Sequence, residues 1–533
     1  MDGKTSKRTT TESSRRAQRF GLLLLLLVAL AVLTACEPEP ELHRSQEPFY
    51  LEATETGLLY EDHVNGCVLT LPAEAEADTS LFPIRTVFSA EGWRLQLFVE
   101  PELNSSKQRS YVGYSNKPLE NGGELTVTNS DSRKAGPNGQ YSATVNAWSR
   151  RPLSRLHDDY PNAVCVDVCI GSSKAVTLLL QYRDGVDAEA LLEPLCSSLQ
   201  GCSATAEAPK LHYGDASTQD AMDGHTRAVF EKLFGEQAGL SWGIFEPTET
   251  TLVLETQTRL PALEEALNYK FTVSVLYMDF ACTVDPIRQR LSRAAEQGIV
   301  TELTVQTTSV SMLFDVLDGQ YDAYLRELAQ AVSSQPTPVL MRLGNEMNGD
   351  WCSWCAYNFG RDGFLYTEFY RYIHDFFRSE GVENAIWVWN PNHRSLPNYA
   401  WNNELVYYPG DAYVDVVGLT AYNTGSYYSG ETWQSFSQLY TDYYAHMSEL
   451  FSQPLMITEF SCSGIGGDKV QWVRDMFAAL DAFPRLRVAV WWNSQDLDWS
   501  KDPPVVARSY QFDDDEAVFA IFREKLPAFP GRD

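Results

Sequence analysis

Basic residues are scarce in this sequence. Its 533 residues hold 42 Lys and Arg against 71 Asp and Glu, and the formal net charge at pH 7 is -29. A protein of that charge repels phosphate groups, so the composition excludes nucleic acid as a partner.

Signals of a bound cofactor are missing as well. No Gly-rich phosphate-binding loop follows the first strand predicted in the C-terminal half, which argues against a doubly wound nucleotide-binding sheet. No cluster of His, Cys and Asp residues has the composition of a catalytic metal site. We interpret the acidic run at residues 513–516 as a solvated turn rather than a calcium site. We therefore expect no cofactor and no metal.

A hydrophobic run long enough for a comfortable membrane span of ~20 residues is also lacking. The apolar stretch at residues 20–33 is shorter, follows a basic segment and ends in Leu33-Thr34-Ala35-Cys36, which resembles a bacterial lipobox. We predict a lipoprotein signal peptide at residues 1–35 and lipidation of Cys36, with the chain exported and anchored to a membrane surface, at the cell surface or in the periplasm. An uncleaved membrane anchor is the alternative.

Aromatic residues, in contrast, are abundant: 13 Trp, 27 Tyr and 25 Phe. Flat rings stack on the C–H faces of sugars. The composition suits carbohydrate binding, and a large aromatic core explains it equally well.

The segment before the C-terminal half divides into two parts. Residues 36–45 are rich in Pro and Glu and are expected to form an extended tether. Residues 46–205 are predicted to be an accessory domain, β-rich or α+β, because alternating strands at 92–99 and 123–128 are separated by turns. A buried strand at 175–180 and a helix at 187–199 complete it. We favour a spacer or stabilising role for this domain over carbohydrate binding.

From about residue 212 the pattern changes to apolar runs that alternate with amphipathic helices. The runs span residues 240–245, 271–278, 299–305, 338–343, 385–389, 414–420, 454–457 and 487–492. Helices are predicted between most of them, among others at 284–296, 319–333, 364–379 and 469–480. Eight β–α repeats over roughly 290 residues predict an α/β fold, a (β/α)8 TIM barrel at 212–525. We expect a monomer.

The cysteines number ten, of which Cys36 is assigned to the anchor, so an odd number is left for an oxidising compartment. Cys352 and Cys355 form a Cys-x-x-Cys motif. We interpret it as a loop-bracing disulfide rather than a redox pair or half of a zinc site.

Two carboxylates follow apolar strands that face each other across the barrel mouth. Glu346 lies just after the fourth predicted strand, and Glu459 lies just after the seventh. Reactive groups of such barrels sit at these strand ends. Glycosidic cleavage needs this kind of pair, with one proton donor and one nucleophile or base, so we predict a glycoside hydrolase.

The barrel resembles glycoside hydrolase family 26, the β-mannanase-type family of the retaining clan A. The resemblance rests on the segments at residues 243–245, 342–349, 387–392, 417–423 and 457–460. It implies that Glu346 is the general acid/base and Glu459 the nucleophile of a retaining reaction on β-linked polysaccharide, β-mannan above all. It also implies that Tyr422 donates a hydrogen bond to Glu459.

One residue departs from the family pattern. Family members usually carry His immediately before the acid/base Glu, and this sequence has Asn345. Most other clan A families place Asn there, where it bonds the sugar 2-hydroxyl. A β-glucanase or xylanase of the same clan is therefore an alternative, as is a non-catalytic surface lipoprotein that captures sugar.

Further residues near these strand ends are predicted to bind substrate. Trp351 and Trp354 follow Glu346 and Trp491 and Trp492 end the eighth strand, which suits sugar stacking or packing of the barrel mouth. The complete set of predicted substrate-binding residues is Asn345, Tyr422, Trp351, Trp491, Arg342, Trp354, Trp492 and His393.

Lipidation of Cys36 is directly testable. Wild type is expected to take up labelled lipid and to partition into the membrane fraction, whereas Cys36→Ala takes up none, because the thiol that carries the lipid is gone. Cell fractionation with a metabolic lipid label measures both properties. Identical partitioning of the two proteins, with no label on wild type, would refute the anchor.

Overall fold

The computed structural model describes residues 39–120, 122–214, 221–253 and 256–532. The predictions of a signal peptide and of lipidation at Cys36 lie outside these residues. Within the described ranges, no helix is both long and apolar enough to cross a bilayer.

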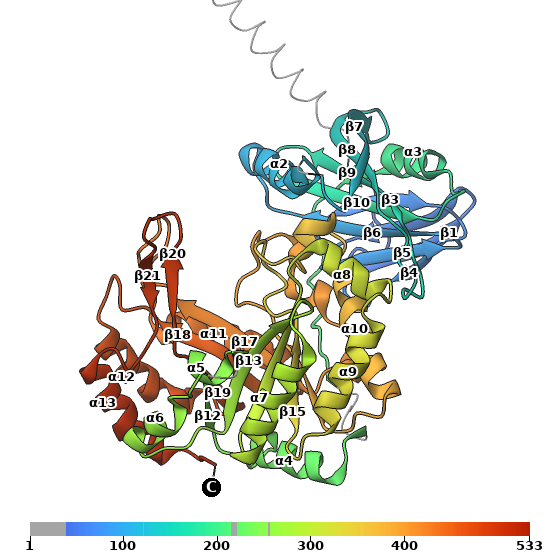
Figure 1. Cartoon of the computed structure of the whole chain (residues 1–533). Helices are drawn as coiled ribbons and strands as arrows, with labels where there is room; N and C mark the ends of the chain where they lie inside the picture. Colours follow the sequence, from blue (N-terminus) through green and yellow to red (C-terminus); the bar gives the residue numbers. More distant parts are fainter. Residues whose placement is uncertain (1–38, 121, 215–220, 254–255, 533) are drawn as a thin grey trace, which may run out of the picture.

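The N-terminal region is β-rich, as predicted (Figure 1). Its small antiparallel sheet has the order β1-β2-β3-β11, with β1 (Phe49–Thr54), β2 (Gly57–Asp62), β3 (Cys67–Leu71) and β11 (Gln200–Gly201). Its large antiparallel sheet has the order β4-β5-β6-β10-β9-β8-β7, with β4 (Glu76–Asp78), β5 (Thr86–Ala90), β6 (Trp93–Glu100), β10 (Lys174–Tyr182), β9 (Asn162–Ile170), β8 (Tyr141–Ser149) and β7 (Thr126–Ala135).

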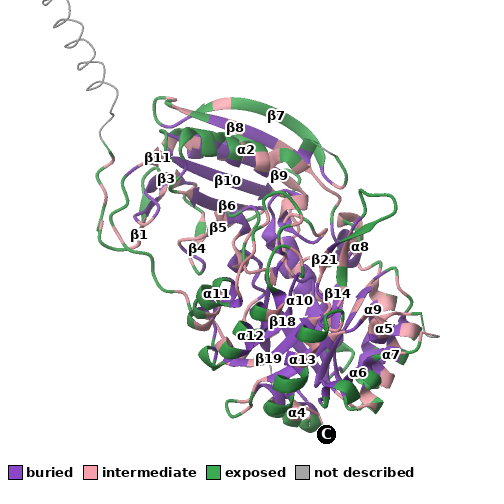
Figure 2. Cartoon of the chain, turned by 90° about the vertical axis from the view of Figure 1, so that its left-hand side faces the viewer, coloured by how far each residue is buried: buried purple, intermediate pink, exposed green. Residues whose placement is uncertain are grey.

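Strand β10 shows how this region is layered. Val176, Leu178 and Leu180 pack with helix α3 (Ala188–Ser198) in one apolar core. On the opposite face, the Thr177 hydroxyl bonds the buried Tyr111 hydroxyl of helix α2 (Ser105–Glu120) at 2.6 Å. Both faces are therefore covered, which explains the continuous apolar run in the sequence. Figure 2 shows the buried central strands and the exposed edge strand β7.

The predicted segment between the signal peptide and this region is only partly described. Glu39 accepts hydrogen bonds from the Ser203 hydroxyl at 2.8 Å and from its backbone N–H at 3.2 Å. The His43 ring lies 2.7 Å from Glu61 on β2. From Glu39 onward, the predicted tether therefore lies against the N-terminal region.

The C-terminal half contains the predicted (β/α)8 barrel. Parallel strands close in the order β12-β13-β14-β15-β16-β17-β18-β19, with β12 (Ser241–Phe245), β13 (Val273–Asp279), β14 (Val300–Gln306), β15 (Val339–Leu343), β16 (Ala385–Trp389), β17 (Val416–Asn423), β18 (Leu455–Cys462) and β19 (Leu486–Trp492). All of the predicted strands are found. A hairpin, β20 (Gln495–Asp498) and β21 (Val505–Ser509), follows the last strand and stands out from the barrel (Figure 1).

Helices surround the barrel and connect its strands. They are α4 (Gly224–Phe234), α5 (Pro247–Thr250), α6 (Leu260–Leu267), α7 (Val284–Glu296), α8 (Val310–Leu317), α9 (Asp322–Ser333), α10 (Gly363–Ser379), α11 (Phe436–Leu450), α12 (Lys469–Ala479) and α13 (Glu516–Lys525). Short 3-10 turns are η2 (Ala356–Phe359), η3 (Ala400–Asn402), η4 (Glu404–Tyr407), η5 (Asp411–Tyr413), η6 (Leu480–Ala482) and η7 (Leu526–Ala528).

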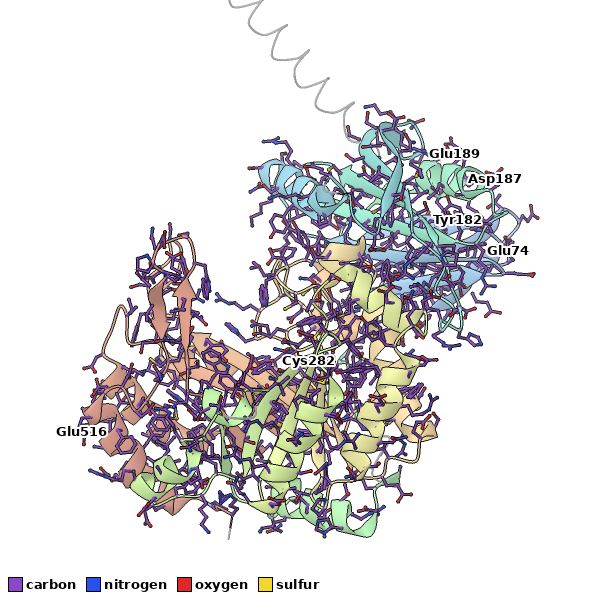
Figure 3. All side chains as sticks on the ribbon, viewed as in Figure 1. Glu74, Tyr182, Asp187, Glu189, Cys282 and Glu516 are labelled. Carbon is purple, nitrogen blue, oxygen red and sulfur yellow. The ribbon has the colours of Figure 1, made fainter. Side chains whose placement is uncertain are left out.

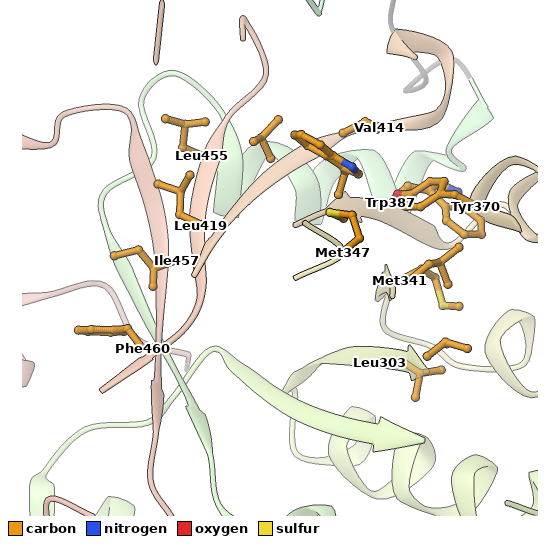
Figure 4. Close-up of a cluster of buried hydrophobic side chains, with 14 of the residues drawn as sticks. Leu303, Met341, Met347, Tyr370, Trp387, Val414, Leu419, Leu455, Ile457 and Phe460 are labelled. Atoms are coloured by element: carbon orange, nitrogen blue, oxygen red, sulfur yellow. The ribbon is translucent and has the colours of Figure 1, made fainter. Parts of the chain in front are cut away.

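Side chains alternate between two cores along each barrel strand. Outward residues such as Met341, Leu419 and Ile457 pack against the helix layer, where Tyr370 of α10 is part of the same cluster (Figure 4). Inward residues such as Leu340 fill the lower barrel interior. Because successive side chains of a strand point to opposite faces, this alternation decides which residues can reach the barrel mouth.

The predicted disulfide between Cys352 and Cys355 is not formed in the structure. All nine cysteines of the described residues are thiols. The Cys352 and Cys355 side chains are hydrogen-bonded to each other. This hydrogen bond is the main cause that raises the pKa of Cys352, and burial of the thiol is the second. The turn that brings them together is closed by the Cys355 N–H, which donates to the Cys352 carbonyl at 3.1 Å.

Candidate active site

Polar side chains fill the upper barrel interior. Among the buried residues that point inward are Glu302 and Thr304 of β14 and Arg342 of β15, followed by Asn390 just after β16. They continue the inward faces that are apolar lower in the barrel. This polar layer therefore closes the lower end of the candidate site.

Glu459 lies in this layer because β18 is irregular. Leu419 pairs with Ile457 while Thr420 pairs with Glu459, so Thr458 is an extra residue of a β-bulge. The bulge turns the Glu459 side chain into the barrel. Three groups donate to this carboxylate: Arg342 Nη2 at 3.2 Å, Asn345 Nδ2 at 3.5 Å and the hydroxyl of Tyr277.

Arg342 connects the two buried carboxyls of the site. Its Nε lies 2.7 Å from Glu302 Oε1 and donates to Thr304 Oγ1 at 2.8 Å, and its Nη1 donates to Asn390 Oδ1 at 3.2 Å. Burial raises the pKa of Glu302 to about 8 despite the adjacent guanidinium. The Arg342 side chain is 0% exposed. The prediction that it binds substrate is therefore wrong, since it lies below Glu459 and holds that carboxylate in place.

Glu346 follows β15 on a left-handed turn. Gly344 has φ 53° and Glu346 itself has φ 57°, a conformation that is uncommon for a residue with a side chain and often found at functional sites. The Glu346 N–H donates to the Asn390 carbonyl at 2.8 Å and fixes this turn against the next strand.

The Glu346 carboxyl accepts two hydrogen bonds. Asn392 Nδ2 donates to it at 2.5 Å and Trp351 Nε1 at 3.3 Å. Burial, followed by the nearby negative charge of Glu459, raises the pKa of Glu346 to about 7, although both donors oppose the rise. The two carboxyls thus share one site but differ in their surroundings.

A cavity of about 1090 Å³ opens above these carboxyls. Its walls come from the loops after β15, β16 and β17 and from the β20–β21 hairpin. The lining includes Trp351, which is 49% exposed, and Trp492, whose ring stacks on Phe245 with centroids 5.0 Å apart at 11°. A cleft with flat rings beside two carboxyls has the shape and chemistry to hold a sugar chain.

Only two of the four predicted tryptophans reach this cavity, Trp351 and Trp492. Trp491 is fully buried, and its ring packs on Phe460 and Phe522 in the helix layer. Trp354 is also buried, where its Nε1 donates to the Asn345 carbonyl at 2.7 Å. The predictions that Trp491 and Trp354 bind substrate are therefore corrected: both are packing residues.

The remaining predicted residues, Asn345, Tyr422 and His393, line the cavity. The hydrogen bond to Glu459 that the resemblance assigns to Tyr422 comes from Tyr277 instead. Both ring nitrogens of His393 are buried and, within the described part of the chain, have no hydrogen-bond partner. Burial lowers the pKa of His393 to about 4, so the ring is neutral and free to bond a hydroxyl. The substrate-binding roles of these residues stay predictions.

The structure adds site residues that sequence reasoning missed. Tyr277 reaches Glu459, Asn392 reaches Glu346, and Gln306 Nε2 donates to Asn345 Oδ1 at 2.9 Å. Tyr277 shares the inward parity of Val273 and Val275 on β13, so strand alternation was the signal that could have found it. Across the described ranges, no group of three or more His, Cys, Asp or Glu residues is placed to hold a metal ion.

These features define a class of protein. A closed (β/α)8 barrel with two carboxyl groups at the open end of its cavity is typical of glycoside hydrolases. A family model described as Glycosyl hydrolase family 26 matches residues 301–463 of the barrel. The resemblance inferred from the strand-end motifs is confirmed.

Known proteins resemble parts of the chain. Endoglucanase H of Acetivibrio thermocellus is 26% identical over 275 residues, which cover 51% of this chain and 30% of that protein. Mannan endo-1,4-beta-mannosidase of Bacillus subtilis strain 168 is 33% identical over 122 residues, covering 22% of this chain and 30% of the relative. The chain thus spans less than a third of the length of these curated relatives.

Among solved structures, a family 26 beta-mannanase from Bacteroides ovatus shares 17% identity with the chain at a TM-score of 0.42. The match covers 58% of this chain and 93% of that one.

The two adjacent tryptophans of β19 are expected to respond differently to truncation. Trp492→Ala should weaken oligosaccharide binding roughly tenfold by removing a stacking surface, while the fold persists. Trp491→Ala should destabilise the fold by roughly 3–5 kcal/mol, because it empties a closed core site. Calorimetric titration with β-linked oligosaccharides and thermal unfolding measure the two effects. Unchanged affinity in Trp492→Ala would remove that ring from the binding surface.

Proposed function

We propose that the chain is a glycoside hydrolase that cleaves a β-linked polysaccharide, β-mannan first, with retention of anomeric configuration. The observation that carries this proposal is the contrast between the two carboxyls of the cleft. Glu459 receives donors from Arg342, Asn345 and Tyr277, which suit an ionised nucleophile. Glu346 has its pKa raised to about 7, which suits a proton donor at neutral pH.

The reaction follows from these roles. Glu346 gives its proton to the glycosidic oxygen while the bond from that oxygen to the anomeric carbon breaks, and a Glu459 oxygen forms a bond to the same carbon. The ionised Glu346 then takes a proton from a water molecule, whose oxygen displaces Glu459. Two displacements at one carbon leave its configuration unchanged.

The choice of β-mannan as first substrate is supported by the family of residues 301–463 and by the name of the Bacillus subtilis relative. A β-glucan is the second candidate, because Asn345 stands where the family usually has His and because another relative is named Endoglucanase H. The aromatic cavity suits either polymer. Display of the enzyme on a membrane by the Cys36 anchor is part of the proposal, supported by the lipobox-like segment.

The catalytic pair is tested by single substitutions on a panel of mannan, glucomannan, lichenan and xylan. Wild type is expected to hydrolyse at least one of them, and Glu459→Ala to hydrolyse none. Glu346→Ala should spare substrates with activated leaving groups, and azide should rescue it as a β-glycosyl azide, since an anion needs no base. Proton NMR of the first-formed anomer reports retention.

Two results would overturn this assignment. An inverted first product would exclude Glu459 as the nucleophile. Binding of a polysaccharide without turnover by wild type would favour the non-catalytic, sugar-capturing alternative.

The pH dependence follows from Glu346. A donor must be protonated, so kcat/KM is expected to be high below pH 7 and to fall as the pH rises through about 7. A substrate whose leaving group needs no proton should lack this alkaline limb in its glycosylation step. Steady-state rates across the pH range measure both. A limb above about pH 9 would assign the donor role to another group.

A further inference from the structure

The N-terminal region rests on the loops at the mouth of the barrel, where the candidate site lies (Figures 1 and 2). Its outer side carries ordinary surface charges: Asp187 and Glu189 of the α3 segment point away from the barrel (Figure 3), and Glu189 pairs with Arg133 at 3.0 Å. The side that faces the barrel is different, because it includes a buried ion pair, Asp167 with Arg361.

On the barrel, the loop at residues 344–362, between β15 and α10, makes several of the contacts with the N-terminal region. It begins at the Glu346 turn, includes Trp351 and ends at Arg361, whose φ of 66° is also left-handed. Its described part has no regular structure beyond η2. A loop with left-handed, side-chain-bearing residues persists only if its surroundings hold it.

The end of the loop is held by a buried ion pair with the N-terminal region. Arg361 Nη1 and Nη2 donate to the two oxygens of Asp167 on β9 at 2.8 and 3.0 Å, and Nη2 also reaches Asn116 Oδ1 of α2 at 2.8 Å. Arg361 and Asp167 are each at most 1% exposed. A bidentate pair in this setting fixes orientation as well as distance.

A second contact holds the middle of the loop, at a point nearer to Glu346. The Tyr114 hydroxyl of α2 donates to Asp350, and the Tyr114 ring packs on Tyr357 with centroids 5.2 Å apart. Asp350 directly precedes Trp351, whose indole N–H donates to Glu346. A continuous path of contacts thus runs from the N-terminal region to the acid/base carboxyl.

The loop after β16 is fixed in the same way. Trp401 Nε1 donates to Ser115 Oγ of α2 at 3.1 Å, and Glu100 of β6 accepts from the Ala400 N–H at 2.5 Å. Burial raises the pKa of Glu100 to about 7. The same loop carries Asn392, the second donor to Glu346.

We propose that the N-terminal region is a positioning element of the catalytic site, and that Tyr114 is a positioning residue that holds Trp351 and Glu346 through Asp350. The proposal rests on the proposed function for its kinetic meaning only. It extends the earlier interpretation of this region as a spacer or stabilising domain: the region completes the wall that presents the acid/base group.

Tyr114→Phe in the full-length protein is the sharpest test, since it removes one hydroxyl and keeps the ring. Amide hydrogen exchange of peptides from residues 344–362 is expected to accelerate at least threefold. The alkaline limb of kcat/KM should also move, because both the burial of Glu346 and its Trp351 bond depend on this loop. Tyr427→Phe is the matched control: Tyr427, in the loop after β17, donates to Asp498 of β20 at 2.9 Å, a hydrogen bond within the C-terminal half.

A second pair of variants covers the acceptor. Asp350→Asn keeps an oxygen for the Tyr114 hydroxyl and should resemble wild type more closely than Asp350→Ala. Loop exchange and a pH profile that are unchanged in folded Tyr114→Phe and Asp350→Ala would overturn the proposal. If wild type hydrolyses no polysaccharide, the proposed function fails, whereas the exchange measurement still decides whether the N-terminal region holds the loop.

Discussion

The ion pair between Arg342 and Glu459, buried in the barrel interior, is the interaction on which the candidate site depends. A buried carboxylate is costly unless it is paired and hydrogen-bonded. Arg342 faces two carboxyls, Glu302 and Glu459, with one positive charge. Because burial raises the pKa of Glu302 to about 8, that group is protonated at neutral pH, and the guanidinium charge is left to Glu459. The guanidinium of Arg342, in the same polar layer, therefore compensates the negative charge of the proposed nucleophile.

The second carboxyl depends on the first. Glu346 is buried beside an ionised Glu459, and both burial and that charge favour its protonated form. Once Glu459 is esterified in the proposed intermediate, its charge is gone and the pKa of Glu346 must fall. The proton donor of the first step can therefore act as the base of the second. One buried pair accounts for both roles.

Strand alternation explains what could be predicted from the sequence and what could not. The apolar runs located every barrel strand, but a run alone does not say which face is inward. Val488 and Val490 fill the barrel interior, so Trp492 points to the mouth and Trp491 to the helices. On β18, regular alternation predicts the wrong side for Glu459. Ile457 points outward, so Glu459, two residues later, is expected to point outward as well. The bulge at Thr458 reverses the parity, and no local feature of the sequence announces it.

Contacts between distant segments were beyond prediction for a different reason. Arg361 and Asp167 are 194 residues apart, and each reads in isolation as an ordinary surface charge. In the fold both side chains are buried, out of contact with water. The charge of each is compensated by the opposite charge of the other. Removal of either partner would leave the other as an uncompensated buried charge. This buried ion pair therefore joins the N-terminal region to the loop that follows Glu346. A domain boundary drawn between them from the sequence alone does not reveal that contact.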